Sequence, residues 1–104
     1  MTYLTNAFSI NMLAREGRAI RFEPVSVERA AELARDAVSA IGHADTAAVV
    51  SSVLGFPVAC NRANVTFAPG DVMLVAQYSG PRLPEGATAL PAGARIEFWL
   101  VHDA

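Results

Sequence analysis

The feature that most constrains the fold is an unbroken apolar run from Val72 to Ala76. Successive side chains of a strand point to opposite faces, so such a run places apolar groups on both faces of a sheet. A strand of this kind must be covered on both sides. We therefore predict a strand over Asp71–Tyr78 at the centre of a sheet.

Other segments have the composition or alternation of strands, with a period of two residues. Pro24 can neither donate a ladder hydrogen bond nor sit in a central strand, so the strand that contains it is expected at an edge or exit. Phe8–Leu13 mixes polar and apolar residues and is expected to form a turn with one helical coil. The further strands are predicted at Tyr3–Ala7, Arg18–Val25, Val58–Cys60, Asn64–Phe67 and Ala94–His102.

Two helices are expected between these strands. Ser26 is a good N-cap for a helix from about Val27 to Val38. A second helix, capped by Asp45 or Thr46, should run to about Leu54, since Gly55 and Pro57 then end it. The order of elements predicts an α/β (α+β) domain: a small mixed sheet with helices packed on it, in one domain spanning residues 1–104.

Composition supports one such domain and limits its function. The chain has 104 residues and is 53% hydrophobic, enough to form a core. Neither a signal peptide nor a membrane-spanning segment is visible in the sequence, which predicts a cytoplasmic protein with no membrane partner. A net charge of −2 argues against a protein that coats long nucleic acids. All eight basic residues are arginines, suited to bidentate phosphate contacts: Arg15, Arg18, Arg21, Arg29, Arg35, Arg62, Arg82 and Arg95.

Residues that commonly bind metals are scarce. Cys60 is the only cysteine, and we expect it to be a buried structural thiol. His43 and His102 are the only histidines, and with Cys60 they match no known zinc spacing. His43-Ala44-Asp45 offers two ligands at most. We therefore predict no metal and no cofactor.

Three polar features are candidates for chemistry, and each also has an ordinary explanation. His43 precedes a helix start, where free N–H groups attract phosphate; it can equally be a capping or packing residue. Arg82 and Glu85 share a loop rich in proline and glycine, where they can bind a phosphate and a hydroxyl or simply form a salt bridge. The third feature is the segment Asn6–Asn11, which can contact a ligand or form a turn.

Taken together, these segments resemble the viral anti-CRISPR ring nucleases of type III systems, first catalogued as a domain of unknown function. The resemblance covers nearly the whole chain except Ala14–Val38. It implies a homodimer that binds cyclic tetra-adenylate and cleaves it without metal, with no other stable protein partner. The matching segments are Tyr3–Leu13, Ser39–Ala47, Asn61-Arg62 with Val65, Gly70-Asp71 with Val75–Gln77, and Arg82–Gly86.

The resemblance also implies roles for particular residues. The catalytic histidine falls on His43, and the active-loop arginine and glutamate fall on Arg82 and Glu85. Asp45 and the Gly80-Pro81 approach to Arg82 depart from the family pattern, which leaves the approach of that loop open. The implied ligand contacts are Asn6, Ser9, Asn11, Thr46, Arg62 and Gln77.

The implied reaction agrees with the residue chemistry. RNA carries its own nucleophile, the 2′-OH, so an enzyme need only align it, stabilise charge on the phosphorus and protonate the leaving 5′-oxygen. Arg82 suits the charge and His43 the proton. Two other readings stay open. One is a non-catalytic module of a virus or mobile element that sequesters a cyclic nucleotide or binds nucleic acid, and the other is a purely structural or interaction protein of a mobile element.

Overall fold

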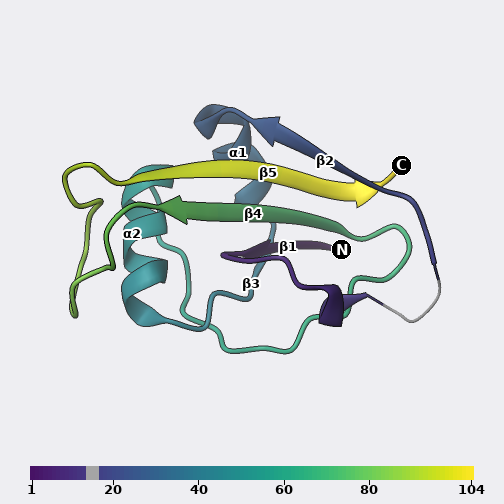
Figure 1. Cartoon of the computed structure of the whole chain (residues 1–104), viewed down its shortest axis with the longest axis horizontal. Coiled ribbons are helices and arrows are strands. Elements are labelled where there is room, and N and C mark those ends of the chain that lie inside the picture. The colour runs from purple at the N-terminus through teal and green to yellow at the C-terminus, as the bar shows by residue number, and fades with distance from the viewer. Residues whose placement is uncertain (14–16) are drawn as a thin grey trace.

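The computed structural model describes residues 1–13 and 17–104, so Arg15 lies outside the described part, and it contains one five-stranded sheet (Figure 1). The sheet order is β2-β5-β4-β1-β3, in which β1 is parallel to both neighbours and β5 antiparallel to both. This mixed sheet with helices confirms the predicted fold class. The elements are β1 Thr2–Thr5, η1 Ile10–Met12, β2 Ile20–Val25, α1 Val27–Ala34, β3 Val38–Ser39, α2 Ala44–Leu54, β4 Val72–Ser79 and β5 Arg95–Asp103.

The central strand is the one that the apolar run predicts. Within β4, the four residues Met73–Ala76 are each at most 4% exposed. Leu74 and Ala76 pack in one hydrophobic cluster, and Met73 and Val75 pack in another on the opposite face. The sheet is therefore covered on both sides at its centre, as the sequence requires.

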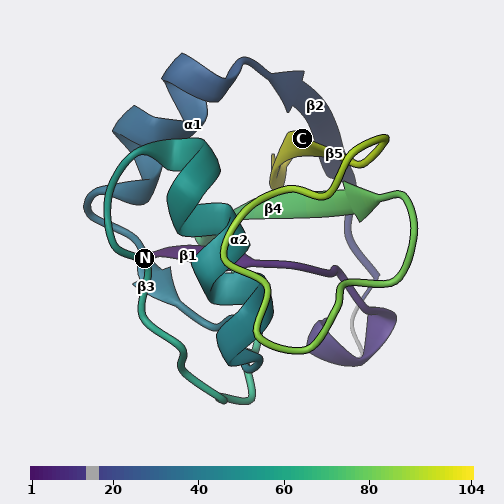
Figure 2. The same ribbon diagram turned by 90° about the vertical axis from the view of Figure 1, so that its left-hand side faces the viewer.

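Both α-helices cover the same face of the sheet, while η1 lies on the other (Figure 2). As predicted, the Ser26 hydroxyl accepts a hydrogen bond from the Arg29 backbone N–H at 3.1 Å and starts α1. Gly55 ends α2 at a φ of 87°, a left-handed conformation that glycine adopts without strain. In the part of the chain that the structure describes, neither helix has the length and apolar content to cross a membrane.

The first helix is shorter than predicted. It ends at Ala34, and Val38, which we expected as its last residue, pairs with Tyr3 in β3 instead. A β-branched residue gains little from a helical turn and more from a sheet partner. The expected helix end at Val38 was therefore wrong, and the connector that follows contains a short edge strand.

The segment between α2 and β4 forms no named strand, so the strands expected at Val58–Cys60 and Asn64–Phe67 were wrong. Its backbone groups bond elsewhere: the Val58 N–H donates to the Ser51 hydroxyl at 2.8 Å, and the Phe67 N–H donates to the Met12 carbonyl at 2.7 Å. Cys60 lies in this segment and is exposed, so the expectation of a buried thiol was also wrong.

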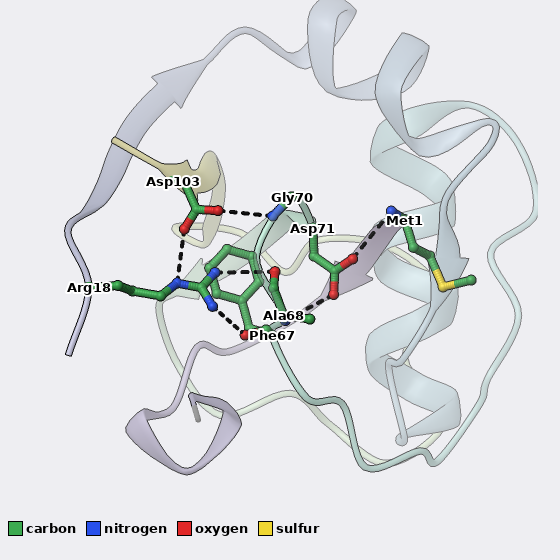
Figure 3. A network of polar contacts seen from close by, with 7 residues as sticks. All are labelled: Met1, Arg18, Phe67, Ala68, Gly70, Asp71 and Asp103. Carbon is green, nitrogen blue, oxygen red and sulfur yellow. Dashed lines mark hydrogen bonds and ion pairs between the residues drawn. The ribbon is translucent and has the colours of Figure 1, made fainter. Parts of the chain in front are cut away.

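The face of the sheet opposite the helices is called here the open face. At one end it is covered by the segment that contains Phe67 (Figure 3). Arg18 donates to the carbonyls of Phe67 and Ala68 at 2.8 and 3.2 Å, and its guanidinium lies 4.4 Å from the Phe67 ring centre. Its Nε also lies 2.9 Å from a carboxylate oxygen of Asp103. One arginine thus ties the long segment after α2 to the end of β5.

Candidate functional site

His43 occupies the N-cap of α2, two or three residues before Asp45 and Thr46, the positions that we expected to cap it. Its backbone is extended, with φ −115° and ψ 127°, and its side chain makes no capping hydrogen bond. Asp45 and Thr46, the expected caps, instead lie in the first turn of the helix. The imidazole of His43 is exposed beside helix N–H groups that no cap side chain satisfies.

The loop between β4 and β5 brings a second group of side chains to this helix end. In Figures 1 and 2 the loop descends beside the end of α2 at which the helix begins. Together they border an open hollow of about 570 Å³, called here the α2 hollow. Its lining residues are His43, Asp45, Thr46, Arg82, Leu83 and Glu85. The fold thus gathers all three implied catalytic residues and one implied ligand contact around one space.

The charge of the α2 hollow is mixed. Arg82 and the helix N-terminus favour an anion, whereas the carboxylates of Asp45 and Glu85 oppose one. One arginine against two acids is too little positive charge for a ligand with several phosphates. A polyanion bound here therefore needs further cations from nearby segments or from a second subunit.

Arg62 is one such cation, since its backbone lies close to the residue before His43. Residues 59–62 run beside residues 39–42: the Asn61 N–H donates to the Ile41 carbonyl at 2.8 Å, and its side-chain amide donates to the Ser39 carbonyl at 2.6 Å. A Cβ on Gly42 would stand 3.4 Å from the Cα of Arg62. This close contact places the backbone of Arg62 beside the residue that precedes His43.

The other implied ligand contacts lie outside the α2 hollow. Ser9 and Asn11 border a separate hollow of about 380 Å³, whose lining mixes polar and apolar side chains. Gln77 borders a third, largely apolar hollow of about 320 Å³ on the open face. Asn6 and Arg62 are exposed and belong to none of these three linings. A single chain thus brings four of the nine predicted site residues together and leaves five apart.

Sequence reasoning assigned no role to several residues that line these spaces. Asp45 and Leu83 complete the α2 hollow, and Asp45 had been considered as a helix cap, a metal ligand and a departure from the family, but not as a ligand contact. Asn64 and Thr66 line the same hollow as Ser9 and Asn11. Their polarity in an apolar chain could have marked them as candidate ligand contacts, but the segment Asn64–Phe67 was interpreted as a strand instead.

Comparison with known proteins agrees with this fold. The family model described as STIV B116-like matches residues 2–93. The chain belongs to the STIV B116-like family. A solved structure of B116 of Sulfolobus turreted icosahedral virus is 32% identical, with a TM-score of 0.82, over 97% of each chain. A search of curated proteins found no match.

These matches cover the α2 hollow. The family match includes both His43 and the Arg82–Glu85 loop, and B116 has the fold that brings these segments together. The chain is therefore related over almost its full length to a viral protein. The chemistry of the hollow has to be argued from its own residues.

Proposed function

We propose that this chain is a metal-independent ring nuclease that binds and cleaves cyclic tetra-adenylate, and so switches off type III CRISPR signalling as an anti-CRISPR protein or a host regulator. The observation that carries the proposal is the α2 hollow. His43 and Thr46 reach it from one segment, and Arg82 and Glu85 from a loop more than thirty residues later in the sequence. These residues are the ones that the resemblance to ring nucleases implies.

The reaction needs no group beyond these side chains and the RNA. The ribose 2′-oxygen attacks the adjacent phosphorus, a new O2′–P bond forms, and the P–O5′ bond breaks. The products are a 2′,3′-cyclic phosphate and a 5′-hydroxyl. Arg82 stabilises the negative charge on the phosphorane oxygens, and His43 donates the proton that the leaving 5′-oxygen acquires.

Glu85 and the start of α2 have supporting roles in this mechanism. The Glu85 carboxylate accepts the proton of the attacking 2′-OH or orients that hydroxyl. The free N–H groups at the helix N-terminus orient the phosphate, which the Thr46 hydroxyl can also contact. Alignment of this kind lowers the barrier because the attacking oxygen is held in line with the bond that breaks.

A non-catalytic module that sequesters a cyclic nucleotide is the second candidate. One observation favours it: within the described ranges, no hydrogen bond joins His43 to Arg82 or Glu85, and all three side chains are exposed. A turnover assay distinguishes the two functions. A sequestering protein releases the ring intact after denaturation, whereas a nuclease releases linear products.

Metal independence is the first testable consequence. We expect cleavage in excess EDTA at an undiminished rate, because the proposed proton and charge transfers use only side chains. Among the described residues there is no group of three or more His, Cys, Asp or Glu placed to hold a metal. Chromatography with mass detection should identify linear products ending in a 2′,3′-cyclic phosphate. Loss of cleavage in EDTA, with recovery on adding zinc, magnesium or manganese, would contradict the mechanism.

The shortage of positive charge in the α2 hollow supports a homodimer with a composite site. A two-fold symmetric dimer presents the same residues twice, which suits a ring of four like nucleotides. The open face is where we expect the subunits to meet. It leaves Phe22 51% exposed beside an apolar hollow, and the implied ligand contact Gln77 borders that hollow.

Light scattering at micromolar concentration should therefore give about twice the chain mass of 11.0 kDa. Phe22→Asp should shift the protein to monomer and reduce cleavage, because it places a charge on the proposed contact. Val27→Asp is the matched control: Val27 is also exposed, at 40%, but starts α1 away from the open face. A monomeric wild-type protein with full activity would rule out the composite site.

A further inference from the structure

The Gly80-Pro81 start of the loop that carries Arg82 departs from the ring-nuclease pattern, and in this chain a hydrogen bond and a close backbone contact hold it. The loop leaves β4 through Gly80 and Pro81. The Tyr78 hydroxyl, from the penultimate residue of β4, donates a hydrogen bond to the Pro81 carbonyl. That carbonyl belongs to the peptide bond that joins Pro81 to Arg82.

Gly80 permits this arrangement. Its φ of 145° is unfavourable for other residues, and a Cβ here would stand 2.8 Å from the Cα of Ala94 and 3.4 Å from the Tyr78 hydroxyl oxygen. Ala94 lies at the other end of the loop, just before β5. The two ends of the loop therefore touch where Gly80 has no side chain, and the Tyr78 hydroxyl reaches past this contact to Pro81.

We infer that Tyr78 is a positioning residue for Arg82. The tyrosine ring is held by the central strand, so its hydroxyl ties the peptide before Arg82 to the most rigid part of the sheet. Pro81 restricts the same peptide further because its ring fixes φ. The guanidinium of Arg82 is thus directed toward the start of α2 by an anchor that does not itself reach the α2 hollow. This role rests on the proposed function, since Arg82 acts there on the phosphorane.

The direct alternative is that the Tyr78 hydrogen bond only stabilises the fold. The structure argues against this, because Tyr78, Gly80 and Pro81 are half-buried or exposed at the periphery of the sheet. A hydrogen bond in such a place changes overall stability little, but it can decide how one loop is held. Loss of the Tyr78 hydroxyl should therefore loosen only this loop, and any loss of activity that follows should depend on the presence of Arg82.

Tyr78→Phe removes only the hydroxyl, and two measurements test its role. Trypsin cleavage between Arg82 and Leu83 should become roughly 2- to 10-fold faster, the factor that corresponds to one ordinary hydrogen bond. Cleavage after Arg62, also exposed, serves as an internal reference in the same digest. Single-turnover cleavage of cyclic tetra-adenylate should fall by a similar factor, and this loss should vanish when Tyr78→Phe is made in an Arg82→Ala background.

Tyr3→Phe is the matched control, because Tyr3 lies on the opposite face of the sheet and should change neither measurement. An unchanged trypsin rate after Arg82, or equal losses of activity with and without Arg82, overturns the inference. If the wild-type protein does not cleave the ring at all, the proposed function fails. The trypsin measurement still decides whether Tyr78 anchors the loop.

Discussion

Replacing His43 by alanine is expected to lower single-turnover cleavage of cyclic tetra-adenylate by about 100-fold or more, the contribution typical of a general acid. Affinity for the ring should stay within a few-fold, because Arg62, Arg82 and the helix N–H groups are retained. Stability should also change little. The imidazole is exposed and makes no capping hydrogen bond, so alanine removes no packed or bonded group.

The experiment compares cleavage rate, ring affinity and melting temperature between the wild-type protein and His43→Ala, with His102→Ala as the control. His102 is half-buried in β5, with Nδ1 2.8 Å from the Asp103 carbonyl oxygen and Nε2 3.5 Å from a Glu23 carboxylate oxygen. Its loss should affect stability and leave cleavage by the folded fraction unchanged. A folded His43→Ala protein that cleaves at nearly the wild-type rate would remove the reason for regarding this chain as an enzyme.

The parts of the fold predicted from sequence are those whose own residues determine them. The run Val72–Ala76 can be satisfied only by burial on both faces, and Ser26 and Gly55 carry the local chemistry of a helix start and a helix end. The coil expected within Phe8–Leu13 is present as η1. In each case a short segment holds enough information to fix its own conformation.

The parts that sequence reasoning missed are determined by partners far along the chain. The strand β3 has two residues and exists because β1 lies beside it. Residues 58–67 have the composition of strands, yet their hydrogen bonds go to Ser51, Ile41 and Met12 rather than to a ladder. No local pattern reveals such partners.

The same distinction applies to the site. The resemblance to ring nucleases placed His43, Thr46, Arg82 and Glu85 in one site, and the structure brings these residues around one hollow. It did not predict the Tyr78 anchor, because a tyrosine near a strand end gives no sign of which carbonyl it will meet. Nor did it show that Ser9, Asn11 and Gln77 lie outside that hollow, where a single chain does not bring them to the catalytic residues.

The largest loss of stability is expected from Phe67→Ala. Phe67 is fully buried although it lies in a segment without named strands, and it packs against Phe8 at 5.8 Å between ring centres. Truncating a buried phenylalanine typically costs about 3–5 kcal/mol, and here the guanidinium of Arg18 also loses the ring beneath it. For a domain of this size, that corresponds to a fall in melting temperature of roughly 15–30 °C.

Thermal unfolding followed by circular dichroism measures this loss, with Phe56→Ala as the matched control. Phe56 also lies under an arginine, with the Arg35 guanidinium 5.0 Å from its ring centre, but it is only half-buried at the edge of the helix-side cluster. Its truncation should cost less than half as much, because less apolar surface returns to water. Both variants remove a ring that contacts an arginine, so the difference between their melting temperatures reports the effect of burying the Phe67 ring. If Phe67→Ala melts within a few degrees of the wild-type protein, the segment after α2 is not held by Phe67, and the placement of Arg62 beside Gly42 must depend on the hydrogen bonds of Val58, Ala59 and Asn61.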